Sequence, residues 1–175
     1  MKDITPIDNS SLLNDACNII EQAQATAYRQ VNETLIKRNW LLGMRIRHEV
    51  LKDERAEYGE QVVKMLAKVL TAKYGEGFTW RNLYNYIDFY ATYNGLFLNE
   101  NGDSVNGQTI LHALRAKSEN IFHALRAKSP IRLTWTHYRI ILQESSKEAR
   151  NWYEREAANE VWSTRTLQRN ISSQR

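Results

Sequence analysis

Residues 75–93, GEGFTWRNLYNYIDFYATY, join a glycine-containing turn to an aromatic helix, and this joint sets the expected fold. Gly75 and Gly77 end the preceding apolar segment, since glycine is common just beyond a helix C-terminus. Thr79 stands where an N-cap belongs, directly before the aromatic run. Two helices separated by a short turn with glycine match the helix-turn-helix arrangement. The stretch therefore predicts a helix-turn-helix-like segment.

The aromatic helix has two faces with different expected roles. Its aromatic side, together with Leu83 and Ile87, is expected to build the core. Arg81, Asn82 and Asn85 lie on the other side. Arginine and asparagine in the first turns of a helix are residue types that reach base edges in the major groove of DNA. These three side chains are therefore candidate base contacts, with a merely solvated polar face as the alternative.

The N-terminal third of the chain predicts one long helix. Apolar residues from Leu12 to Leu35 recur at steps of three and four, which indicates one long amphipathic helix, or two collinear ones, over about 10–52. We expect this stripe to face the core, with Cys17 beside it as a core thiol. Gly43 interrupts the pattern and is interpreted as tolerated.

A second amphipathic helix is predicted over 60–74, after a polar joint at 52–60. The residues expected to point inward are Val62, Leu66, Val69 and Leu70.

The middle of the chain carries a tandem repeat. Residues 94–108 are rich in Asn, Gly and Asp and predict a loop. ILHALRAKSEN is then followed by IFHALRAKSPI, and a period of eleven residues is about three helical turns. This predicts a helix over about 108–128 with a repeated basic stripe, although a duplication that only lengthens a helix is the alternative. His112 and His123 would lie about 16 Å apart along its axis, too far to share a metal ion.

The C-terminal third predicts three shorter helices. LTWTHYRIILQ holds an apolar residue, a capping threonine (Thr134) and a tryptophan, followed by a helix. Ser145 or Ser146 opens the next helix, and Ser163 caps the last. With only seven glycines and two prolines, the chain favours helices over a many-stranded sheet. The predicted fold is all-α: a single multi-helix domain over 10–175, with a long N-terminal helix and a flexible N-terminus over 1–9.

The net charge of +4 is unevenly distributed. Basic residues gather between 104 and 139 and after Ser163, whereas acids gather around 53–60. This asymmetry favours a polyanion partner, with a solvated basic face as the alternative. Lys and Arg in 115–139 and 165–169 would neutralise phosphates. His137 would approach bases together with the three residues of the aromatic helix. The candidate DNA-binding residues are Arg81, Asn82, Asn85, Arg126, Lys128, Thr136, His137, Arg139, Arg165 and Arg169.

Signatures of an enzyme are missing from the sequence. There is no P-loop, no dinucleotide-binding glycine fingerprint, no set of Cys and His at metal-ligand spacing, and no Glu-x-Lys pair of the kind used by PD-(D/E)xK nucleases. We therefore expect no catalytic residue, no cofactor and no metal. One cysteine, no signal peptide and no long apolar run predict a soluble cytoplasmic protein without a membrane partner.

Several boxes of the sequence occur together in a known order: NWLLGMRIRHEV, KYGEGFTWRNLYNYIDFY, LTWTHYRIIL, RNWYEREA and VWSTRTLQRNI. Over about residues 12–175 the chain resembles the N-terminal domain of the YhcG-like PD-(D/E)xK nuclease family of bacteria. The resemblance implies a helix-turn-helix-like DNA-binding domain that serves a separate C-terminal nuclease domain, in cis or in trans. The chain departs from the family in two places. The first HALRAKS copy looks inserted, and the chain ends at ISSQR, where relatives continue.

The alternative from a different class is a protein-interaction or dimerisation module. The long first helix and the repeat segment would then pack against a second copy or another subunit, so that a homodimer or a nuclease subunit would be the partner.

Overall fold

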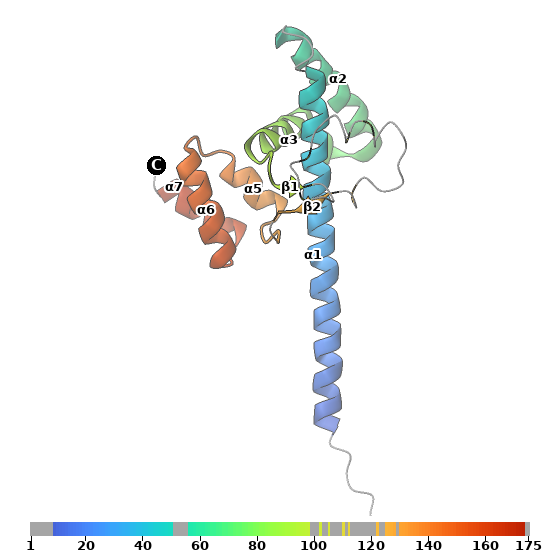
Figure 1. Cartoon of the computed structure of the whole chain (residues 1–175), viewed down its shortest axis with the longest axis vertical. Coiled ribbons are helices and arrows are strands. Elements are labelled where there is room, and N and C mark those ends of the chain that lie inside the picture. The colour runs from blue at the N-terminus through green and yellow to red at the C-terminus, as the bar shows by residue number, and fades with distance from the viewer. Residues whose placement is uncertain are drawn as a thin grey trace, which may run out of the picture.

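The computed structural model describes residues 9–50, 56–98, 102, 105, 110, 112, 122, 125–128 and 130–173. Within these residues the protein is mostly helical, which confirms the predicted fold class (Figure 1). The elements in chain order are α1 (Asn9–Val50), α2 (Ala56–Tyr74), the 3-10 helix η1 (Glu76–Phe78), α3 (Trp80–Thr92), β1 (Phe97–Leu98), β2 (Arg126–Ala127), α5 (Trp135–Ile141), α6 (Lys147–Asn159) and α7 (Thr164–Ser173). No helix among the described residues is both long and apolar enough to cross a bilayer. The predicted flexible segment at 1–9 lies outside the described residues except for Asn9, which begins α1.

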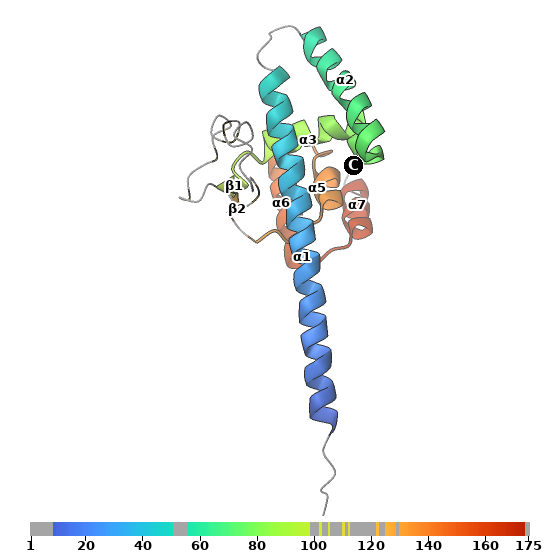
Figure 2. The same ribbon diagram turned by 90° about the vertical axis from the view of Figure 1, so that its right-hand side faces the viewer.

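Helix α1 is one continuous helix, the first of the two predicted alternatives, but its two halves have different surroundings. The C-terminal half runs through the body of the molecule, whereas the N-terminal half projects from it (Figures 1 and 2). The expectation that the stripe from Leu12 to Leu35 faces the core was wrong. Leu12, Ile19 and Val31 are 67 %, 69 % and 60 % exposed, and Cys17 is exposed rather than a core thiol.

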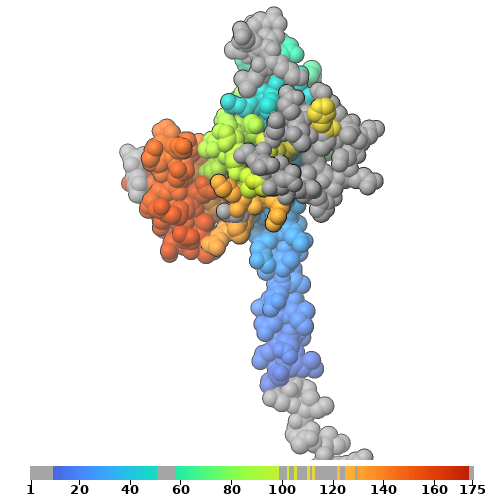
Figure 3. Space-filling model, viewed as in Figure 1, coloured from blue at the N-terminus to red at the C-terminus, as the bar shows by residue number. Residues whose placement is uncertain are grey.

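The reason for this error is that no described element packs against the N-terminal half of α1. Every residue from 10 to 31 is exposed, whichever side of the helix it lies on (Figure 3). The face that the body covers starts only at Ile36 and continues through Trp40 and Met44.

Trp40 is the centre of the larger core cluster. Its ring is fully buried and meets Tyr90 and Phe97 edge-on, at centroid distances of 4.9 and 5.5 Å. Its indole N–H donates a hydrogen bond of 2.9 Å to the carbonyl oxygen of Tyr93. The apolar ring and the satisfied N–H together fix α1 against α3 and the strand that follows it.

Gly43 allows α1 and α3 to cross in direct backbone contact. A Cβ atom at this position would lie 1.9 Å from the carbonyl oxygen of Tyr86 and 3.1 Å from the amide nitrogen of Ile87. Glycine inside a helix is normally unfavourable. Here it has a packing role that the sequence pattern alone did not predict.

A smaller core cluster holds α2 against α1 and α3. Its buried members are Ile46, Val63, Ala67, Leu83 and Tyr86. Helix α2 begins at Ala56, so part of the predicted polar joint is helical. Val69 is 57 % exposed instead of pointing inward, because α2 directs Val63 and Ala67 towards the core.

A short antiparallel sheet replaces two predicted features of the middle segment. Phe97 pairs with Ala127, so the predicted loop at 94–108 contains a strand and the predicted helix at 108–128 does not extend to its expected end. The extended backbone lets the buried side chains of Phe97 and Leu125 both enter the core. Most of the repeat, with the basic stripe predicted for it, lies outside the described residues.

The predicted caps of the three C-terminal helices are confirmed. Thr134 forms a capping box at the start of α5. Ser146 Oγ accepts a hydrogen bond of 3.2 Å from the amide of Ala149, and Ser163 Oγ accepts one of 3.1 Å from the amide of Thr166. Helix α7 then buries Leu167 and Ile171 against α5 and the neighbouring core.

Candidate nucleic-acid interface

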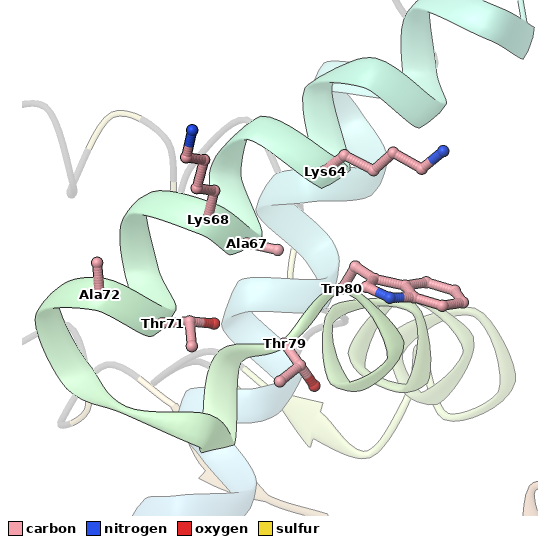
Figure 4. Close-up of a pocket in the computed structure, with 7 residues that line it drawn as sticks. All are labelled: Lys64, Ala67, Lys68, Thr71, Ala72, Thr79 and Trp80. Carbon is pink, nitrogen blue, oxygen red and sulfur yellow. The ribbon is translucent and has the colours of Figure 1, made fainter.

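A groove of about 560 Å³ lies between α2 and the start of α3 (Figure 4). It is lined by Lys64, Ala67, Lys68, Thr71, Ala72, Thr79 and Trp80. Its floor is apolar and small-sided, and its edges carry cationic and aromatic side chains. We call this feature the α2–α3 groove.

Two lysines from α2 border the groove. Lys64 and Lys68 are one helical turn apart and both are exposed. Lys64 forms an exposed ion pair with Glu60, and this hydrogen-bonded partner raises the pKa of the Lys64 ammonium. Exposed ion pairs contribute little to stability. Lys64 can therefore exchange Glu60 for another anion at small cost.

Trp80 contributes an exposed aromatic face. The aromatic side of this helix was expected to build the core, and for Trp80 this expectation was wrong, because Trp80 is 49 % exposed. It lies six residues before Tyr86, where α1 crosses α3, so it precedes the part of α3 that α1 covers. Its ring meets Tyr84 edge-on at 6.1 Å, and the Arg81 guanidinium lies 5.5 Å from its centroid. Figure 4 shows Lys64 and Trp80 extending in the same direction from the two helices.

The turn between α2 and α3 is held by hydrogen bonds from α3. Asn82 Nδ2 donates to the carbonyl oxygen of Glu76 at 3.1 Å, and Tyr86 Oη donates to that of Gly77 at 2.9 Å. Thr79 occupies the N-cap position but makes no side-chain hydrogen bond to the first turn. The uncapped amides add to the positive end of the helix dipole at the groove.

The structure separates the other predicted DNA-binding residues into distinct surfaces. Arg126 and Lys128 are exposed beside a second groove that includes Glu33 and Lys37 of α1. Arg139, Arg165 and Arg169 are exposed on α5 and α7, whereas Thr136 and Asn85 are half-buried. Figures 1 and 2 both place β2 apart from α7, so these cations do not form one continuous patch.

His137 has a structural role in this fold. It is buried, and its Nδ1 accepts from the amide of Thr134 at 3.2 Å and lies 2.7 Å from that residue's Oγ1. Its Nε2 then donates to the carbonyl oxygen of Trp162 at 2.9 Å. Both ring nitrogens are engaged, so the predicted approach of His137 to bases has no support from its position. The spacing Thr134-x-x-His137 was a capping-box signal that sequence reasoning missed.

Lys64 and Lys68 were also missed. Their spacing of four residues on an amphipathic helix was the signal, since such residues share a face. Clustering along the chain drew attention instead to the basic region between 104 and 139.

Glu154 on α6 is a partly buried carboxyl group beside a third groove. It shares this groove with Arg132, Asn151 and Arg155. Burial raises the pKa of Glu154, and the nearby hydroxyl of Tyr93 lowers it only in part. Among the described residues no group of three or more His, Cys, Asp or Glu side chains is placed to hold a metal ion.

Comparison with known proteins adds to this geometry. A family model, the DUF1016 N-terminal domain, matches residues 15–175. The chain is 29 % identical over 163 residues to the protein named "Putative nuclease YhcG" of Escherichia coli (strain K12). That similarity covers 90 % of this chain and 43 % of the relative, so the chain spans less than half of the relative's length. No solved structure matches the chain.

Proposed function

Because the chain belongs to the DUF1016 N-terminal domain family, we propose that it is a DNA-binding module that brings a nuclease domain to its target, in cis or in trans. The relative from E. coli is named a nuclease, and this chain corresponds to less than half of it. The observation that carries the proposal is the α2–α3 groove, with Lys64, Lys68 and Trp80 along its border and the Arg81 guanidinium 5.5 Å from the centroid of the Trp80 ring.

The chemistry of this border suits a DNA strand. Lys64, Lys68 and Arg81 supply positive charge for phosphates, and the uncapped start of α3 adds the positive end of its dipole. Trp80 offers a face for stacking or for apolar contact with a sugar. Arg81 and Asn85 lie in the first two turns of α3, the part of a recognition helix that contacts base edges. In this proposal α2, η1 and α3 act as a helix-turn-helix unit, and Asn82 positions its turn.

The other exposed cations among the predicted DNA-binding residues are proposed as phosphate contacts. Arg126 and Lys128 would engage one stretch of backbone, and Arg139, Arg165 and Arg169 another. Because these surfaces are separate, a duplex that reached more than one of them would have to bend or extend around the body. Thr136 beside Arg139 is the remaining candidate for a phosphate hydrogen bond.

Salt-dependent fluorescence anisotropy tests the proposal. A labelled duplex and a labelled single strand would be titrated with the protein from about 50 to about 300 mM salt. The logarithm of the affinity should fall by roughly 0.9 per phosphate contact for each tenfold rise in salt concentration. We expect tight duplex binding with a steep slope. Binding of both nucleic acids that is weak at the lowest salt would contradict the proposed function.

Matched variants locate the surface. Replacing Lys64 and Lys68 by alanine should reduce the magnitude of the slope by roughly 1.8, as expected for two lost phosphate contacts. Lys73→Ala is the control, because Lys73 is an exposed lysine of the same helix about 140° away from Lys68. Arg81→Ala should change sequence preference, whereas Lys128→Ala should weaken all sequences about equally. If only Lys73→Ala had an effect, the α2–α3 groove would not be the DNA surface.

A second candidate function is protein–protein interaction, and one observation favours it. The N-terminal half of α1 exposes aliphatic side chains along a helix that stands clear of the body (Figure 2). Monomeric proteins rarely leave large apolar surfaces uncovered. Light scattering tests this role independently of DNA, since a monomer at all concentrations would argue against it.

A further inference from the structure

The lining of the α2–α3 groove is unlike a surface that reads base pairs. Its floor is made of the short side chains of Ala67, Thr71 and Thr79. Lys64 and Trp80 extend in the same direction along its two sides (Figure 4). The edges of paired bases are read by polar side chains that match their donors and acceptors. A largely apolar groove of about 560 Å³ suits the flat face of a base or the carbon atoms of a sugar instead.

Trp80 provides an aromatic platform at the side of this groove. Its side chain is about half exposed. The Arg81 guanidinium lies 5.5 Å from the ring centroid, and the ring of Tyr84 meets it edge-on at 6.1 Å. These contacts support the indole and leave part of its surface open to a ligand. Stacking of bases on aromatic side chains, together with a positively charged groove, is how proteins commonly hold single-stranded nucleic acid.

The outward face of α3 is poorly suited to reading a duplex. Of the three predicted base contacts on this helix, Asn82 and Asn85 are half-buried and only Arg81 is exposed. The side-chain amide of Asn82 also donates to a carbonyl oxygen of η1. Asp88 is exposed one turn beyond Asn85 on the same face, and its carboxylate would be repelled by the phosphates that border a DNA groove. Base-edge reading by α3 is therefore limited to its first turn.

We propose that the α2–α3 groove binds an unpaired nucleotide of a DNA strand, with the base stacked on Trp80 and the neighbouring phosphates on Lys64 and Lys68. The two lysines are about 6 Å apart along the axis of α2, so they can reach different phosphates of one strand. In a duplex the lysines still contact the backbone, but the faces of the bases are covered by their neighbours. Trp80 therefore adds affinity only where a base is unpaired. This inference rests on the proposed DNA binding and names the form of DNA that the groove prefers.

Fluorescence anisotropy with three labelled duplexes of the same paired sequence tests this preference. One duplex is blunt, one carries a short thymidine tail, and one carries an abasic tail of equal length, which keeps the phosphates and removes the bases. A base stacked on one aromatic side chain should make the thymidine tail bind roughly 5- to 100-fold more tightly than the abasic tail at the same salt concentration. Equal affinities for the two tails would overturn the proposal.

Tryptophan variants locate the stacked base. Trp80→Ala should remove the preference for the thymidine tail, whereas Trp80→Phe keeps an aromatic ring and should retain most of it. Trp152→Ala is the matched control, because Trp152 is 40 % exposed on α6 and does not line the groove. Thermal unfolding followed by circular dichroism checks that each variant is folded. A preference that survives Trp80→Ala, or that disappears equally in Trp152→Ala, would place the base elsewhere and refute the proposal.

A base analogue gives a second readout that needs no variant. The fluorescence of 2-aminopurine falls when this base stacks on an aromatic ring. With 2-aminopurine in the thymidine tail, binding of the wild-type protein should therefore lower its emission. The same analogue inside the paired region is already stacked and should change little. A bound tail whose emission stayed constant or rose would contradict stacking on Trp80.

The blunt duplex separates this inference from the proposed function. Tight, salt-dependent binding of the blunt duplex without a preference between the two tails would leave the DNA-binding role in place and remove the unpaired nucleotide from the groove. Failure of the wild-type protein to bind any of the three DNAs would remove the proposed function itself.

Discussion

Replacing Gly43 by alanine is expected to destabilise the protein, although the same change in an ordinary helix would stabilise it. Alanine is favoured over glycine in a helix interior by about 1 kcal/mol. At Gly43, however, the added Cβ would lie 1.9 Å from the carbonyl oxygen and 2.5 Å from the carbonyl carbon of Tyr86. Both are backbone atoms of α3, so no change of rotamer can relieve the overlap.

The magnitude follows from these opposing effects. Overpacking that shifts a backbone typically costs about 1–3 kcal/mol, and a clash between two helix backbones belongs at the upper end. After the helix-propensity gain, we expect a net loss of roughly 1–2 kcal/mol in the free energy of unfolding. For a chain of this length that corresponds to a fall in Tm of roughly 2–8 °C.

Thermal unfolding followed by circular dichroism measures this loss. Gly95→Ala is the matched control, because a Cβ there meets nothing within 4 Å and its backbone does not have a positive φ. We expect the control to change stability little. If Gly43→Ala were as stable as the wild type or more stable, the close crossing of α1 and α3 would be refuted.

Three further predictions concern the C-terminal helices. Burial raises the pKa of the Glu154 carboxyl above its ordinary value of 4.5, so the folded state binds this proton more tightly than the unfolded chain. The stability that Glu154 contributes is therefore greatest below pH 4.5 and is lost as the pH rises through the raised pKa. Glu154→Gln should therefore flatten the fall in stability above pH 4.5 in urea titrations at several pH values, and an unchanged profile would show that this carboxyl is not responsible. His137→Ala should cost about 1–3 kcal/mol, because it removes the capping box and leaves the Trp162 carbonyl without its ring donor; chemical denaturation measures this, and a loss near zero would contradict the structural role. Ser146→Ala should cost about 1 kcal/mol through the lost cap on the Ala149 amide, whereas an alanine variant as stable as the wild type would mean that water replaces the cap.

Local signals were sufficient for the helices and most of their ends. Ser146 and Ser163 cap the helices expected of them, because an N-cap hydrogen bond involves only residues two or three positions apart. Gly75 ends α2 for an equally local reason, since it adopts a positive φ that other residues rarely tolerate. The long α1 and the turn before α3 followed from the same kind of information.

The candidate site was predicted only in part. Arg81 was identified from its place in the first turn of α3, and its guanidinium lies 5.5 Å from the centroid of Trp80, which lines the α2–α3 groove. The neighbouring lysines of α2 were missed, because the groove forms only when two helices pack. His137 looked like a free polar residue from its position in the chain. In the fold its ring is buried and pairs with the Trp162 carbonyl, which lies 25 residues away in the sequence.

The amino-acid sequence by itself determined the helical class, the caps and glycine stops, and the resemblance to a nuclease-associated domain, because these depend on contacts within a few residues or on the order of motifs. The tertiary structure alone decided which faces are covered. It turned Gly43 into a crossing point and the end of the predicted repeat helix into a strand beside Phe97. It also left the aliphatic side chains in the N-terminal half of α1 exposed. Burial depends on which elements meet in space, and a hydrophobic stripe in a sequence does not specify its partner.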